Sequence, residues 1–150
     1  MWPPRSMTPA QWRVQVEFSL LRLSVARGQW TEAHDAARAI LEANGVPEDV
    51  RRRFGASDPH EAVTAFLRRS LANTRASAAA AYVPPTRYAT LLALLGDGDG
   101  AIDWLETAAS DRDPELATVL RDPEMQPLRD RPRFVTLQRR ILRPPAAPAS

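Results

Sequence analysis

The spacing of apolar and polar residues predicts helices along the whole chain. In the first expected helix, apolar side chains recur every three or four residues and so share one helical face: Trp12, Val16, Leu20, Leu23 and Ala26. Thr8 followed by Pro9 is typical of a helix start, with a capping hydroxyl before a proline. Gly28 suits the left-handed position that ends a helix. No segment alternates apolar and polar residues as a half-buried strand would, so the predicted fold class is all-α.

The same pattern predicts seven further helices, with approximate bounds 31–45, 47–55, 60–81, 86–95, 100–110, 115–120 and 133–143. Asp58, Asp113 and Asp122 each precede a proline, and we interpret all three as helix caps. The connections are short, which favours antiparallel packing of neighbouring helices. We expect one helical domain over residues 8–143, a disordered N-terminal lead over 1–7 and a disordered Pro/Ala tail over 144–150.

Two of the helix–turn–helix segments share a register. Gly28 is followed five residues later by Ala33, and Gly96 is followed five residues later by Ala101. Two further pairs keep this register: Ala37 with Leu105, and Ile40 with Ala108. The glycines are 68 positions apart, twice the 34-residue period of the tetratricopeptide repeat. Such a repeat places glycine at the sharp turn and a small residue where two helices approach closely.

The unit expected between these two segments is degenerate. Ala62 stands at the position of its turn glycine, and Leu67 stands at the position of its small residue. Because alanine is abundant in this chain, alanine matches alone carry little weight. A generic helical bundle is therefore the alternative to a repeat.

Motifs in the C-terminal half extend this interpretation. They read "YVPP", "LLGDGDGAIDWLETA", "DRDPEL", "RDPEMQPLRDRPRF" and "LQRRI". The segment 82–142 resembles the tetratricopeptide-type region at the C-terminal end of many bacterial signalling proteins, including winged-helix regulators, adenylate cyclases and protein kinases. The stretch 28–71 is compatible but looser. Arg131 departs from the family pattern, which has aspartate before this proline, and this change should weaken the helix cap there.

The resemblance implies a short right-handed superhelix of stacked antiparallel helix pairs. It also implies a non-enzymatic module that binds another protein or a peptide within a bacterial regulatory or signalling system. By the family's geometry, the partner-binding groove would include Gln15, Phe18, Arg22, Thr86 and Thr90. Arg22 could pair with a carboxylate of the partner.

The stretch "LLGDGDGAIDWLE" can be aligned with a calcium-binding EF-hand loop. Asp97, Asp99, Asp103 and Glu106 then fall on positions three, five, nine and twelve. Leu95 occupies the first position, where a carboxylate ligand is needed. We therefore interpret the stretch as a turn in which Asp97 and Asp99 cap the following helix. A calcium-responsive module that depends on Glu106 is the less favoured alternative.

Composition excludes several kinds of chemistry. The chain of 150 residues has no cysteine, which excludes disulfides, thiolate metal sites and a cysteine nucleophile. The net charge is only +2, and all twenty basic residues are arginine. A nucleic-acid binder would normally carry a larger basic excess. Arg51–Arg53 and Arg139–Arg140 are the clusters that could meet phosphates, so a small arginine-rich nucleic-acid-binding domain stays an alternative.

No motif in the sequence indicates catalysis. His34 and His60 are the only histidines, and we expect both to be solvated on helix surfaces. Phosphate loops, nucleophile elbows and zinc-ligand spacings are absent from the sequence, so we expect no enzyme activity, cofactor or metal. The sequence contains neither an apolar run of membrane-spanning length nor a signal-peptide pattern, so a cytoplasmic location is expected. Self-association is a further possibility.

Overall fold

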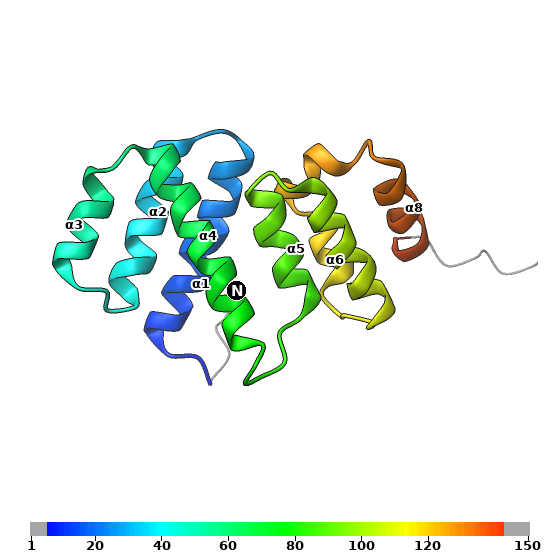
Figure 1. Cartoon of the computed structure of the whole chain (residues 1–150), viewed down its shortest axis with the longest axis horizontal. Helices are drawn as coiled ribbons and strands as arrows, with labels where there is room; N and C mark the ends of the chain where they lie inside the picture. The colour runs from blue at the N-terminus through cyan, green and yellow to red at the C-terminus, as the bar shows by residue number, and fades with distance from the viewer. Residues whose placement is uncertain (1–5, 143–150) are drawn as a thin grey trace, which may run out of the picture. The chain divides into compact units, whose positions relative to one another are not determined.

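The computed structural model describes residues 6–142, and this part of the chain is helical without any strand (Figure 1). The elements are α1 (Pro9–Ala26), α2 (Trp30–Ala43), α3 (Glu48–Ala56), α4 (Pro59–Ser77), α5 (Pro85–Leu94), α6 (Gly98–Ser110), α7 (Leu116–Val119), the 3-10 helix η1 (Pro123–Leu128) and α8 (Pro132–Ile141). The all-α prediction is confirmed. The predicted disordered ends, 1–7 and 144–150, lie almost wholly outside the described residues.

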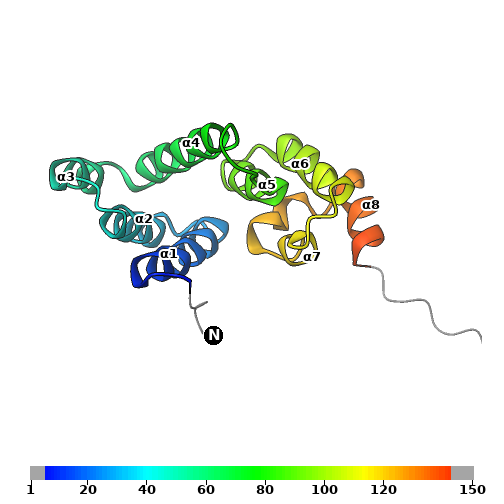
Figure 2. The same cartoon turned by 90° about the horizontal axis from the view of Figure 1, so that it is seen from below.

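The chain divides into two compact units, Met1–Ser70 and Leu71–Ser150. The boundary lies inside α4, within the region that the sequence suggested as one domain. Each unit contains one helical hairpin, formed by α1 and α2 in unit 1 and by α5 and α6 in unit 2. The two helices of each pair lie side by side in both Figure 1 and Figure 2.

Unit 1 is built on the α1–α2 hairpin. Leu21 of α1 is fully buried, as are Ala33 and Ala37 of α2. Alanine leaves room for the two helix backbones to approach, so the small residues of the predicted register lie in the contact between the helices. Val63 and Leu67 of α4 are also buried in this unit.

Unit 2 is built on the α5–α6 hairpin. The rings of Tyr88 and Trp104 stack between the two helices, with centroids 4.1 Å apart and planes 13° apart. Ala101, Leu105 and Ala108 of α6 are fully buried. Downstream, Phe134 and Leu137 of α8 are also buried.

The same kind of turn closes both hairpins. Gly28 and Gly96 have positive φ, 70° and 84°, and sit one residue beyond the C-cap of α1 and α5. The amide of Asp97 donates to the carbonyl oxygen of Leu92 at 2.9 Å, which completes a Schellman motif. Glycine is suited to this position because it has no Cβ to clash.

The degenerate middle unit lacks this turn. The connection between α3 and α4 passes through Ser57, whose backbone is extended, with φ −80° and ψ 158°. Leu67 is nevertheless buried, like its counterparts Ala33 and Ala101, whereas Ala62 is buried and its counterparts Gly28 and Gly96 are exposed. The register of small and apolar residues therefore persists here, whereas the glycine turn does not.

Candidate partner-binding face

Helix α1 carries apolar residues on more than one side. One face holds Leu21 and Ser24, its two buried residues, and packs against α2. The apolar stripe recognised in the sequence lies on the other face, because Val16 and Leu20 are respectively 41% and 49% exposed. The stripe is therefore not the core-facing side of the helix. Its remaining large members, Trp12 and Leu23, are half-buried.

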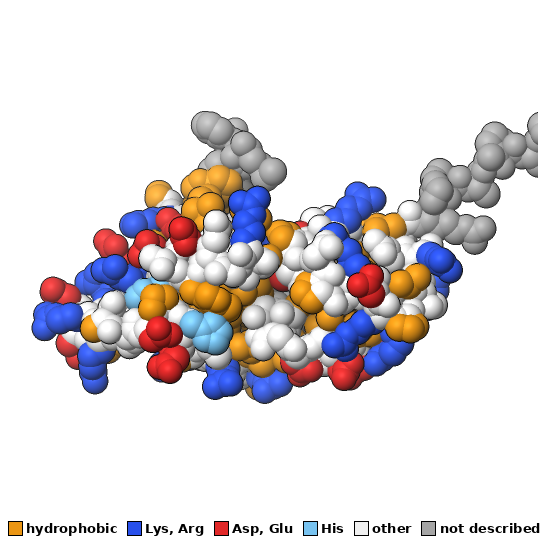
Figure 3. Space-filling view, turned by 90° about the horizontal axis from the view of Figure 1, so that it is seen from above, with side chains coloured by type: hydrophobic (Ala, Val, Ile, Leu, Met, Phe, Trp, Pro, Cys, Tyr) orange, Lys and Arg blue, Asp and Glu red, His pale blue; other side chains and the backbone are white. Residues whose placement is uncertain are grey.

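The outer face of α1, defined here as Trp12, Val16, Leu20 and Leu23, follows a spacing of four, four and three residues. That spacing forms one continuous ridge on a helix. A helix that is apolar all round is normally covered all round, yet Val16 and Leu20 at the centre of this face are exposed. Figure 3 shows hydrophobic side chains at the α1 edge of unit 1, next to arginines.

The five predicted groove residues are distributed over both units. Gln15 is exposed on α1, and Phe18 and Arg22 on the same helix are half-buried. Gln15 and Arg22 are seven residues apart and lie along one edge of the outer face of α1. Thr86 and Thr90 lie on α5 and are buried, so these two threonines do not present their side chains to a partner in this structure.

Thr86 has an internal partner instead. The hydroxyl of Thr86 donates to Asp113 Oδ2 at 2.9 Å, and its backbone amide donates to the same oxygen at 3.3 Å. Asp113 therefore caps α5, whose own N-cap, Pro84, offers no side-chain acceptor. The other carboxylate oxygen accepts from the amide of Glu115 at 2.9 Å. The sequence predicts that Asp113 caps the helix that follows it, but the N-cap of α7 is Glu115, and Asp113 caps a helix that begins 28 residues earlier in the chain.

The other predicted caps have mixed outcomes. Asp58 accepts from the amide of Glu61 at 3.1 Å and caps α4 as expected. Asp122 is the N-cap residue of η1 but makes no side-chain cap hydrogen bond there. Asp97 accepts from the amide of Gly100 at 3.0 Å and caps α6.

The stretch aligned with a calcium loop is the turn between α5 and α6. Helix α6 already begins at Gly98, inside the would-be loop. Asp99 lies in the first turn of α6 but does not cap it; its carboxylate forms an ion pair with Arg131 at the start of α8. Among the described residues, no group of three or more histidines, aspartates or glutamates is placed to hold a metal ion.

Two further carboxylates of this stretch also face arginine. Arg133 Nη2 lies 2.5 Å from Asp103 Oδ1 and also pairs with Glu106, which in addition accepts from Arg133 Nε at 3.3 Å. The side-chain hydrogen bond to Glu106, followed by that to Asp103, raises the pKa of Arg133 above its usual range. We call Asp99, Asp103, Glu106, Arg131 and Arg133 the α6–α8 ion-pair cluster. It attaches α8 to α6.

The sequence reasoning missed this cluster, although a signal for it was present. Asp99, Asp103 and Glu106 are spaced four and three residues apart, which places three carboxylates on one helical face. Arg131 makes no side-chain cap bond, as the departure from the family pattern suggested, and reaches α6 instead. A Cβ at Gly98 would lie 2.7 Å from a guanidinium nitrogen of Arg131, so this glycine makes room for the arginine.

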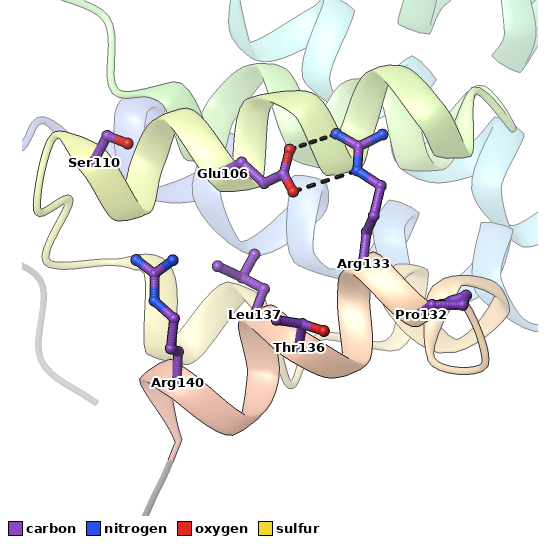
Figure 4. A pocket seen from close by; sticks show the side chains of 7 residues that line it. All are labelled: Glu106, Ser110, Pro132, Arg133, Thr136, Leu137 and Arg140. Carbon is purple, nitrogen blue, oxygen red and sulfur yellow. Dashed lines mark hydrogen bonds and ion pairs between the residues drawn. The ribbon is translucent and has the colours of Figure 1, made fainter.

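A pocket of about 340 Å³ lies beside this cluster, between α6 and α8 (Figure 4). The paired Glu106 and Arg133 stand at one end, Arg140 lies toward the other end below Ser110, and Leu137 projects between them. The only carboxylate in the lining is already ion-paired, and no histidine lines the pocket.

The two histidines have structural roles in unit 1. His34 is buried rather than solvated, and its Nε2 lies 2.8 Å from the carbonyl oxygen of Phe54, to which it donates. Its ring also contacts the Phe54 ring, with centroids 4.9 Å apart. His60 is exposed, as expected, and meets the Trp30 ring edge-on at 4.2 Å. These contacts connect α2 to α3 and to the start of α4.

The arginine cluster Arg51–Arg53 is engaged along its own helix. Its contacts are to the carbonyl oxygen of Val46 at 2.9 Å, to Glu48 at 3.7 Å and to Asp49 at 3.1 Å. Each contact is local, as on a solvated helical surface. The cluster therefore carries its own counter-charges, which reduces its attraction for phosphate.

Comparisons with protein-family models, with curated proteins and with solved structures find no match to this chain. The described part of the chain also contains no helix of the length and apolarity needed to cross a membrane.

Proposed function

We propose that this chain is a non-enzymatic helical module that binds another protein, and that the outer face of α1 is its docking surface. One observation carries the proposal: α1 is apolar on both sides, and only one side is covered. Leu20 is about half exposed. A partner that covers Leu20 and its neighbours would gain about 25 cal/mol of binding free energy for each Å² of apolar surface removed from water. Gln15, Phe18 and Arg22 lie on the same helix and stay predicted contacts.

We also propose that the two hairpins are tetratricopeptide-type units of a right-handed superhelix. Support comes from their matching Schellman turns at Gly28 and Gly96 and from the burial of the register residues after both glycines. The spacing of the glycines, two repeat periods, agrees with this assignment. A role in a cytoplasmic bacterial signalling system rests on the sequence resemblance alone.

The outer face of α1 would act in helix-to-helix recognition. Residues at spacings of three and four are the anchors by which one amphipathic helix packs on another. A surface of one helical face is small, so we expect a reversible complex with a dissociation constant on the order of micromolar. The contact would depend chiefly on the large side chains at the centre of the ridge.

A pull-down with matched variants tests the proposal. The full chain, its Leu20→Asp variant and its Gln126→Asp variant are used as bait in host lysate treated with nuclease. We expect a protein that wild type and Gln126→Asp retain and that Leu20→Asp loses, because a carboxylate on the ridge would have to be buried. Circular dichroism checks that Leu20→Asp still folds. Recovery of the same proteins by all three baits, or loss of all recovery on nuclease treatment, would contradict the proposal.

A further inference from the structure

The charged residues around the outer face of α1 indicate the chemistry of its partner. From Pro9 to Arg27 the segment contains three arginines and a single carboxylate. Arg27, exposed, comes four residues after Leu23 and continues the line of the ridge. Arg13 lies three residues before Val16 and borders the ridge on one side, while Arg22 borders it on the other, beside Gln15. Arginine therefore stands on both edges and at the C-terminal end of the ridge.

The single carboxylate of this segment, Glu17, lies between the ridge and the buried face, because it is four residues after Arg13 and three before Leu20. Glu17 is four residues before Leu21 and seven before Ser24, the two residues buried against α2. Glu17 is itself half-buried. The border of the ridge therefore holds three arginines against one half-buried carboxylate, which leaves an excess of positive charge.

One border arginine has a weak contact within unit 1. Arg13 lies 3.8 Å from Glu42 of α2, and the two side chains are 50% and 57% exposed. An exposed ion pair of this length contributes little to stability. A partner carboxylate could therefore replace or share this contact without disturbing the α1–α2 hairpin.

We propose that the outer face of α1 binds an amphipathic helix whose apolar stripe is bordered by glutamate or aspartate. This inference rests on the docking function proposed above and adds the charge of the partner. The apolar ridge would supply most of the affinity, while the arginines would select acidic partners and orient them. Arg13 and Arg27 are separated by about 21 Å along the helix axis, so a partner helix of about four turns could place carboxylates near both.

A single-helix partner fits this surface better than a membrane. The apolar ridge is narrow, with Val16 and Leu20 exposed between half-buried Trp12 and Leu23, and such a ridge matches the groove between neighbouring ridges of another helix. A membrane-surface helix instead buries a broad apolar face and is rich in basic residues along its polar face. In α1 the residues next to the ridge, Leu21 and Ser24, are buried, and α1 packs against α2.

Two synthetic helical peptides test the charge of the partner. Both are 18-residue peptides with leucine at identical positions spaced three and four apart, and they differ only in having glutamate or arginine along the borders of the stripe. Fluorescence anisotropy with the full chain should show at least about tenfold tighter binding of the glutamate peptide at low salt. The difference should shrink as sodium chloride is raised, because salt screens exposed charges.

Variants of the full chain separate this inference from the function on which it rests. Arg13→Glu combined with Arg27→Glu should reverse the preference, whereas Arg52→Glu with Arg53→Glu, equal in charge and located on α3, should leave the order of the two peptides unchanged. Equal binding of both peptides, abolished by Leu20→Asp, would overturn the acidic preference and leave the docking face in place. Binding of neither peptide would overturn the preference for an acidic helix, while the pull-down would still report on docking itself. Binding of anionic lipid vesicles but of neither peptide would replace the helix partner with a membrane surface.

Discussion

Asp113, on the loop after α6, accepts hydrogen bonds from both the hydroxyl and the backbone amide of Thr86, at 2.9 Å and 3.3 Å. Both residues are buried. The contact ties the start of α5 to the end of α6, the two ends of the hairpin that are far apart in the sequence. Thr86, which the family resemblance placed in the partner-binding groove, is therefore part of the internal structure of unit 2.

Replacement of Asp113 by alanine should destabilise the protein by about 1–3 kcal/mol, because it leaves the amide and hydroxyl of Thr86 buried without their acceptor. The measurement is urea denaturation followed by circular dichroism. Asp111→Ala, two residues away on the exposed C-cap of α6, is the matched control and should change stability by less than about 0.5 kcal/mol. Equal effects of the two variants would contradict the role assigned to Asp113.

Replacement of Arg112 by glycine should increase the stability of the protein. Arg112 occupies the position after the C-cap of α6 with φ 54°, the left-handed conformation that Gly28 and Gly96 adopt at the matching positions of α1 and α5. Left-handed backbone costs an L-residue about 1–2 kcal/mol, and the greater freedom of glycine in the unfolded chain offsets part of that gain. We therefore expect Arg112→Gly to raise stability by up to about 1 kcal/mol.

The matching control is a change from glycine to a residue with a Cβ, made in the turn between α5 and α6. Gly96→Ala should lower stability by about 1 kcal/mol, since it introduces a Cβ at φ 84°. Thermal melts of both variants against wild type give the comparison. A loss of stability on Arg112→Gly would show that the arginine side chain stabilises the turn by more than its backbone conformation costs.

Removal of Arg133 should loosen α8 through loss of its two ion pairs. Arg133→Gln breaks the contacts to Asp103 and Glu106, whereas Arg139→Gln on the same helix breaks no contact found among the described residues. The pairs are exposed and screened by salt, so we expect a small decrease in the denaturation midpoint that fades at high ionic strength. Hydrogen exchange of the α8 amides should report the change most directly. A decrease independent of salt would indicate that packing, not charge, attaches α8.

Loss of the His34 side chain should release α3 from α2. His34→Ala removes the hydrogen bond to the Phe54 carbonyl and the ring contact, and we expect a cost of about 1–3 kcal/mol. Faster hydrogen exchange confined mainly to α3 is the expected signature. His60→Ala, which affects an exposed ring, is the comparison and should leave α3 protected. Similar exchange in both variants would argue against the assigned contact.

Local patterns in the sequence were sufficient to predict the helices and several of their ends. Thr8 caps α1 through a complete capping box with Gln11, and Gly28 and Gly96 take the left-handed positions expected of them. These features depend on residues three to five positions apart, for which the helix geometry is fixed. The buried register after each glycine follows for the same reason.

The sequence could not show which side of a helix with two apolar faces would be covered. On α1 the larger stripe, which includes Val16 and Leu20, is the exposed one, while Leu21 and Ser24 contact α2. Periodicity identifies a face but not its neighbour, because the choice depends on how α1 and α2 pack together. The packing of α1 on α2 therefore leaves the candidate docking surface exposed.

Contacts between residues distant in sequence were likewise decided only by the tertiary structure. The sequence supplied Asp99, Asp103 and Glu106 on one face of α6, a spacing equally compatible with solvent, a metal ion or a basic partner. The packing of α8 places Arg131 and Arg133 against these carboxylates, just as the closure of the α5–α6 hairpin places Asp113 at Thr86. The sequence by itself thus determined the helices and their polar faces, whereas packing between helices determined which charges and apolar ridges found partners.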